Sequence, residues 1–284
     1  MEDMTMSPTV AQWQLATDLR KLRGDKKLSE VARAIKVNVS TVSRWETPGV
    51  EGAIPGPGSL ERILEFYELD AEAIQRFLHV RKEARSSGWW QSSGVAEDYG
   101  TYIGLENEAR RIRTYEPVLI PGLMQTEAYI RALFKGTMPS AAPEVVDAGV
   151  EVRLTRQTNW DERGAHLWAI ISESAIRTTV GGSKVMAEQI RHLIQVSEQR
   201  NVTLQVLPFE AGAHAALEIG KFTLLTLDEL SVLVTITDNT SLFWDDQEAL
   251  ERHTDVFERL LADAWRPAQT IEFLDRYAQA LEKE

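Results

Sequence analysis

The chain has 284 residues, of which 43% are hydrophobic, and this is enough to build two packed domains. It contains no cysteine, which excludes disulfides, thiol chemistry and cysteine-ligated zinc. No run approaches the roughly 18 consecutive apolar residues of a membrane span, and the N-terminus lacks the layout of a signal peptide. We therefore expect a cytoplasmic protein that does not enter a membrane.

The net charge of −12 at pH 7 is distributed unevenly along the chain. Residues 1–45 contain eight Lys and Arg against five Asp and Glu, whereas residues 86–284 contain 18 against 30. Phosphate groups would attract the first segment and repel the second. Any contact with nucleic acid is therefore expected near the N-terminus.

The N-terminal segment predicts a short tail and then three helices. Residues 1–9 have no periodic pattern and are predicted to be disordered. Apolar residues recur at helical spacing over 10–23, 28–35 and 39–45, with a tight turn at Lys36 and Val37. Asn38 is a favourable N-cap for the third helix, and Val42 with Trp45 forms its inward stripe.

The outward side of that third helix carries small, polar and basic residues. A slim helix of this kind fits a major groove about 12 Å wide. We predict that the base-contacting residues are Asn38, Val39, Ser40, Thr41 and Arg44. The predicted phosphate-contacting residues are Arg20, Lys26, Lys27 and Ser43, although a solvated cluster explains each lysine alone equally well.

The run IKVNVSTVSRWE resembles the helix-turn-helix of XRE-type, lambda repressor-like transcriptional regulators. The resemblance implies a DNA-binding unit that reads double-stranded DNA. Lys36 replaces the usual turn glycine, and a left-handed lysine costs about 1 kcal/mol. Lys27 replaces the usual N-capping Ser or Thr, so we expect Asp25 to cap the second helix or that helix to fray at its start.

Two further helices complete the predicted N-terminal domain. A loop over 46–59 rich in glycine and proline either touches the DNA backbone or is mobile. Ser59 is expected to cap the fourth helix and Asp70 the fifth, giving an all-α, five-helix, repressor-like domain over 10–85. Residues 86–100 are predicted to be a hinge, in which Trp89 and Trp90 provide packing, a partner contact or a ligand cage.

Residues 101–284 are predicted to be an α+β domain with a small antiparallel sheet packed on helices. The segment 102–115 has a helical pattern, and strands are expected near 167–171, 203–207, 221–227, 231–237 and 242–244. The stretch LENEARRIRTYEPVLIPGLMQTEAY resembles a C-terminal domain of unknown function found in actinobacterial regulators. Within it, the PGLMQT corner around Gln125 is read as structural or as part of a ligand site.

No catalytic motif is visible, so we expect no enzyme activity. The five histidines show no metal-binding spacing, and Walker, GxGxxG and GxSxG patterns are absent. Gly181 to Lys184 has the look of a phosphate loop but fits a helix N-terminus better. No metal or cofactor is expected.

The hypothesis is a sequence-specific transcriptional regulator that binds a palindromic operator as a homodimer. The resemblance adds a small partner protein encoded nearby, in a toxin–antitoxin-like arrangement. Two alternatives remain. One is an antitoxin-like interaction module whose main role is to bind that partner. The other is a regulator gated by a small-molecule effector near Trp89, Trp90 and Gln125.

Overall fold

The computed structural model describes residues 7–90, 96–228, 230–237 and 240–283. The chain divides into two compact units, Met1–Glu108 and Ala109–Glu284. Most of the predicted N-terminal tail, residues 1–6, lies outside the described residues, as do residues 91–95 of the predicted hinge. Ser7, Pro8 and Thr9 of the predicted tail are described, and Pro8 begins the first helix.

The first unit is all-α in its described part. Its core gathers the apolar stripes that the sequence pattern predicts, including Leu15, Leu19, Val42 and Trp45. The first unit also contains a sixth helix, which overlaps the helix predicted over 102–115 and begins earlier, at Glu97. The helices are α1 (Pro8–Arg23), α2 (Leu28–Ile35), α3 (Val39–Trp45), α4 (Pro57–Phe66), α5 (Ala71–Ala84) and α6 (Glu97–Glu108).

The helix starts confirm some of the predicted caps and correct others. Asp70 caps α5 by accepting a hydrogen bond from the Ala73 N–H at 2.7 Å. Helix α4 begins at Pro57 and not after Ser59, since proline at the first helical position is already set for helical φ. The expected cap of α2 by Asp25 is wrong, because the N-cap residue is Lys27 and no side chain caps it.

Helix α6 packs on α1 through a glycine. The Ser7 hydroxyl donates a hydrogen bond to the Gly104 carbonyl oxygen at 3.2 Å. A Cβ at Gly104 would lie 2.4 Å from Oγ1 of Thr9 and 2.9 Å from the ring of Trp90. Only glycine therefore fits this crossing, and the start of α1 is held against α6.

The second unit is α+β, as expected, but its sheet is larger than predicted and mixed. The six strands have the spatial order β3-β2-β1-β4-β5-β6. Strands β1, β2 and β3 pair in parallel, while β1, β4, β5 and β6 pair antiparallel. They are β1 (Arg111–Glu116), β2 (His166–Ser172), β3 (Val202–Leu207), β4 (Phe222–Thr226), β5 (Ser231–Thr237) and β6 (Thr240–Trp244).

Strand β1 corrects the prediction of one helix over 102–115. The helix ends at Glu108, and the chain continues as a strand in the middle of the sheet. The sequence of β1, RIRTYE, is mostly polar, and its apolar residues Ile112 and Tyr115 are both buried. Pairing with β2 on one side and β4 on the other fixes it as a strand, and both partners are distant in sequence.

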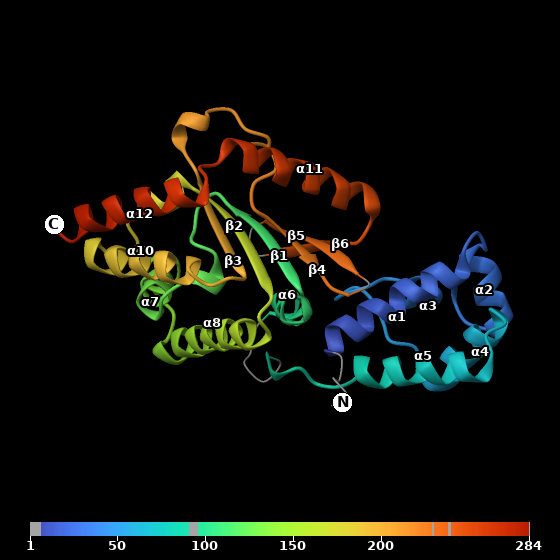
Figure 1. The fold of residues 1–284 in the computed structure, drawn as a ribbon. Coiled ribbons are helices and arrows are strands. Elements are labelled where there is room, and N and C mark those ends of the chain that lie inside the picture. Colours follow the sequence, from blue (N-terminus) through green and yellow to red (C-terminus); the bar gives the residue numbers. More distant parts are fainter. Residues whose placement is uncertain (1–6, 91–95, 229, 238–239, 284) are drawn as a thin grey trace. The chain divides into compact units, whose positions relative to one another are not determined.

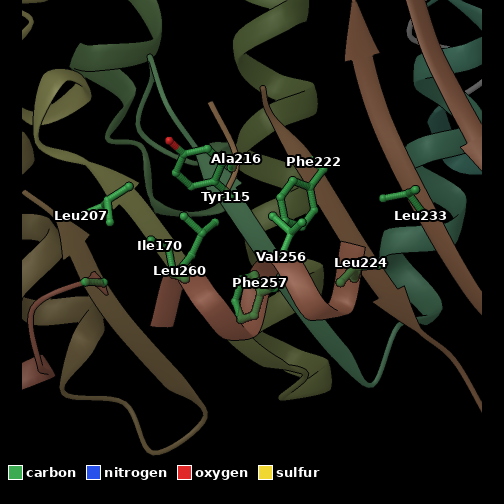
Figure 2. Packing of buried hydrophobic residues seen from close by; sticks show 11 residues of the cluster. Tyr115, Ile170, Leu207, Ala216, Phe222, Leu224, Leu233, Val256, Phe257 and Leu260 are labelled. Carbon is green, nitrogen blue, oxygen red and sulfur yellow. The ribbon is translucent and has the colours of Figure 1, made fainter. Parts of the chain in front are cut away.

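Helices cover both faces of the sheet (Figure 1). Helix α11 lies along one face, and the apolar core between them is drawn in Figure 2, where Phe257 and Leu260 of α11 meet Tyr115 and Phe222 of the strands. The helices of this unit are α7 (Glu127–Thr137), α8 (Pro143–Arg163), α9 (Glu173–Arg177), α10 (Ser183–Ser197), α11 (Gln247–Asp263) and α12 (Pro267–Leu281).

The edge strand β3 is covered where the chain passes from α11 to α12. The Val206 N–H donates to the Thr270 hydroxyl at 3.1 Å, and the Trp265 N–H donates to the Val206 carbonyl at 2.9 Å. Those bonds satisfy edge groups that would otherwise be open to another strand. No helix in the described part of the chain is long and apolar enough to cross a membrane.

Candidate nucleic-acid interface

Helix α3 has a buried side and an exposed side. Val42 is fully buried and Trp45 is 7% exposed, so these two side chains fix the helix on the core of the first unit. Val39 is 46% exposed, and Asn38, Ser40 and Arg44 are exposed as well. The base-reading side chains predicted from the sequence therefore lie on one open face, except Thr41, which is half-buried.

The turn between α2 and α3 has the strained geometry that the sequence predicts. Lys36 has φ 58° and ψ 51°, in the left-handed region that disfavours residues with a Cβ. The Val37 N–H donates to the Ala32 carbonyl at 3.0 Å and closes the turn. Asn38 occupies the N-cap position of α3, but its side chain makes no capping hydrogen bond.

An ion pair joins the end of α1 to the end of α3. Nε of Arg23 lies 3.0 and 2.8 Å from the two carboxylate oxygens of Glu46. The same guanidinium donates through Nη1 to the Lys26 carbonyl oxygen at 2.9 Å. One side chain thus ties α3 to α1 and fixes the turn that carries the predicted phosphate-binding lysines.

This ion pair lies in a desolvated environment. Burial raises the pKa of Glu46, and the guanidinium of Arg23 opposes that rise. Burial also raises the pKa of Tyr67, and the charge of Glu46 adds to the increase. A charged hydrogen bond in such surroundings is stronger than the same bond in water, which makes it an effective anchor for α3.

The predicted phosphate-contacting residues differ in exposure. Lys26 and Lys27 are exposed in the turn before α2, where the first N–H groups of a helix also favour an anion. Ser43 and Arg20 are half-buried. The two lysines are consequently the side chains best placed to approach a phosphate.

The loop after α3 is tied to the helices of the first unit. The Ala53 N–H donates to the Arg44 carbonyl at 2.8 Å, and the Gln12 amide donates to the Gly49 carbonyl at 3.0 Å. Nε of Arg81 donates to the Pro55 carbonyl at 2.6 Å. The loop therefore has a defined path beside the C-terminal end of α3.

Trp89 and Trp90 contact each other between α5 and α6 of the first unit. Their rings meet edge to face, with centroids 5.8 Å apart. Trp90 is 5% exposed, and its ring packs close to Gly88 and Gly104. These contacts support the packing interpretation of the pair.

The PGLMQT corner in the second unit is held by buried amide side chains. Gln125 is 4% exposed, and its Nε2 donates to the Ile120 carbonyl at 2.7 Å. Gln157 donates from Nε2 to the carbonyl oxygens of Gly122 and Gln125, each at 2.8 Å. Because these amides satisfy backbone groups that the corner leaves unpaired, they support a structural role for it.

Comparison with known proteins identifies the family of the second half of the chain. Residues 99–276, more than half of the chain, match the model of a domain of unknown function, DUF5753. The chain belongs to the DUF5753 family. The matched segment runs from α6 through α12 and contains the PGLMQT corner.

No curated protein matches the chain. Among solved structures, the chain is similar to TrmBL2, which is described as an archaeal chromatin protein with a novel mode of DNA binding. The identity is 10%, and the match covers 90% of this chain and 94% of that one with a TM-score of 0.28. A TM-score this low does not establish a shared fold, and the DUF5753 description carries no function.

The sequence pattern missed the Arg23 and Glu46 pair as a unit. The side chain of Arg23 is 21% exposed and engaged with Glu46. The available signal was the position of Glu46 directly after the buried Trp45, where a lone carboxylate needs a partner. Among the described residues of this DUF5753 protein, no three His, Asp or Glu side chains could hold a metal ion together.

Proposed function

We propose that the chain is a sequence-specific DNA-binding transcriptional regulator of the XRE type. The main support for this proposal is the open face of α3, where Asn38, Val39, Ser40 and Arg44 are exposed. Val42 and Trp45 anchor the opposite side of the helix in the core. Arg44 suits guanine or a phosphate, and the Val39 methyls suit the thymine methyl group. Lys26 and Lys27 add the positive charge that a phosphate backbone requires.

A single N-terminal DNA-binding unit would bury too little surface on DNA for tight binding, so the active form in this proposal is a homodimer. The two N-terminal units of the dimer would bind a palindromic operator with half-sites about one helical turn apart. The second unit would supply the dimer contact and the partner or signal response. Its acidic balance keeps it away from phosphates and leaves α3 as the part that approaches DNA.

A second candidate is an interaction module for a small partner protein. Exposed large apolar side chains on the second unit favour it, because such side chains often mark contact surfaces. They are Val118, Met138, Val145, Phe209, Leu217, Leu242 and Trp244. The toxin–antitoxin-like arrangement belongs to this candidate, which predicts partner binding that survives the loss of DNA contacts.

The test is selection of binding sites from random duplex DNA with the full chain, followed by titration of variants on the selected site. Arg44→Ala combined with Thr41→Ala is expected to remove specific binding while the fold is retained. Each lost base contact costs about 1–3 kcal/mol, or roughly tenfold to a hundredfold in affinity.

Arg76→Ala is the matched control, because Arg76 is an exposed arginine on α5. That variant should bind the operator like the parent protein. Unchanged operator affinity in the Thr41 and Arg44 double variant would contradict the proposed interface. Failure to select any sequence would contradict the function itself.

A further inference from the structure

A half-open cavity of about 320 Å³ lies at the surface of the second unit, between the sheet and the N-terminal half of α11. This size is at the lower end of the range for small-molecule sites in proteins. None of the residues that line it belongs to the PGLMQT corner. Its lining consists of Arg113, Leu224, Leu225, Thr226, Ser231, Asp245, Gln247, Leu250, Glu251, Thr254 and Asp255.

The guanidinium of Arg113 is the distinctive group in this lining. Arg113 pairs with Leu224 across the sheet, and Leu224 belongs to the core that α11 covers (Figure 2). The guanidinium therefore lies on the helix-covered face, 5.7 Å from the centre of the Phe257 ring. Its Nε is buried and has no hydrogen-bond partner among the described residues.

An unpaired buried donor of this kind is costly to the protein. Nε is closed off from solvent, so a ligand would have to meet the remaining N–H groups of the guanidinium, whose desolvated positive charge favours a negative partner. Burial lowers the pKa of Arg113, the neighbouring Arg111 adds to that effect, and the carboxylate of Glu258 opposes it. A carboxylate that receives its N–H groups would satisfy the geometry and the charge together.

The other residues of the lining indicate which second charged group the ligand has. Asp245, Glu251 and Asp255 line the same cavity, so three carboxylates accompany the single guanidinium. A simple anion would be repelled by the three acids, and a simple cation would leave Arg113 without an acceptor. A ligand with one negative and one positive group satisfies both.

We propose that this cavity binds a small zwitterion of the amino-acid class. Its carboxylate would pair with Arg113, and its ammonium group would face the carboxylates of Asp245, Glu251 and Asp255. The leucine side chains of the lining would contact an aliphatic part of the ligand. A folded macromolecule cannot enter a cavity of this size, which favours a free metabolite.

The test is calorimetric titration of the full chain, without DNA, with each common L-amino acid. For an amino acid that binds, the matched probes lack one charged group at a time. With leucine as the example, these are 4-methylpentanoate, which lacks the ammonium group, and isopentylamine, which lacks the carboxylate. Each loss is expected to weaken binding by at least about tenfold.

Arg113→Met tests the site itself. Methionine fills similar volume on an apolar face and removes a desolvated charge, so the variant is expected to fold with undiminished thermal stability and to bind at least about tenfold more weakly. Arg200→Met, which removes an exposed arginine in the turn before β3, is the matched control and should bind normally. Asp255→Asn should weaken binding of the zwitterion but not of 4-methylpentanoate.

Three results would overturn the proposal. They are no binding by any L-amino acid to the folded protein, equal binding in Arg113→Met, and equal binding of the carboxylate that lacks the ammonium group. None of these measurements involves DNA. The failure of ligand binding can therefore be distinguished from the failure of the proposed DNA-binding function.

Discussion

Arg23 and Glu46 form a two-oxygen ion pair, with Nε of the arginine 3.0 and 2.8 Å from the carboxylate oxygens. The side chain of Glu46 is 5% exposed and that of Arg23 is 21% exposed. The pair connects the last residue of α1 to the residue that follows α3. Its geometry therefore controls how α3 is held against α1.

Removing the arginine should destabilise the first unit in a pH-dependent way. Arg23→Met leaves the Glu46 carboxylate buried and unpaired, which costs about 3 kcal/mol at neutral pH. The pKa of Glu46 is already raised by burial, and the variant raises it further because the opposing guanidinium is gone. A raised carboxyl pKa contributes stability that is complete below the ordinary value and is lost as the pH rises through the folded value.

The gap in unfolding free energy between the parent protein and Arg23→Met should therefore grow from mildly acidic to neutral pH. Urea unfolding at both conditions measures it. Arg33→Met, which removes an exposed arginine from α2, should leave a small gap that does not change with pH. A gap for Arg23→Met that is equal at both pH values would contradict the assigned role of Glu46.

Lys36→Gly should stabilise the protein by about 1 kcal/mol. Lys36 is held at φ 58° and ψ 51°, where glycine has no penalty from a Cβ. The gain is measured by thermal unfolding, as a rise in the midpoint temperature of the transition of the first unit. Ala34→Gly is the matched control, because this exposed residue inside α2 should lose about 1 kcal/mol from the same substitution. If Lys36→Gly also destabilises, the left-handed assignment is wrong.

The sequence predicts the first unit better than the sheet because the evidence there is local. Helical spacing fixes α2 and α3, and the missing glycine at Lys36 points directly to the strained turn. Strand β1 was misread as helix since its state depends on pairing with β2 and β4, far along the chain. The buried Nε of Arg113 is likewise invisible in sequence, because α11 covers that face of the sheet only in the folded unit.

Gln189 should be essential to the PGLMQT corner. It is fully buried, its Oε1 accepts from the Thr126 N–H and its Nε2 donates to the Met124 carbonyl, both at 2.7 Å. Gln189→Leu leaves both backbone groups unsatisfied and should cost about 2–4 kcal/mol. Urea unfolding measures the loss. Gln195→Leu, on the exposed side of α10, should change stability little, and a similar loss in both variants would refute the specific role.

Neutralising Lys26 and Lys27 should weaken DNA binding without changing sequence preference. Each lysine that contacts a phosphate releases a counterion, so each substitution with glutamine should reduce the slope of log affinity against log salt by about 0.9. Fluorescence anisotropy over a salt series, on the selected operator and on a scrambled duplex, measures both properties.

The salt slope separates these lysines from the residues of α3. Arg44→Ala is expected to lose discrimination between the operator and the scrambled duplex, whereas Lys26→Gln and Lys27→Gln should weaken binding to both equally. Lys82→Gln, an exposed lysine on α5, is the control and should leave the slope unchanged. An unaltered slope in the Lys26 and Lys27 variants would mean that the turn held by Arg23 does not approach the phosphate backbone, and the interface would then be restricted to α3.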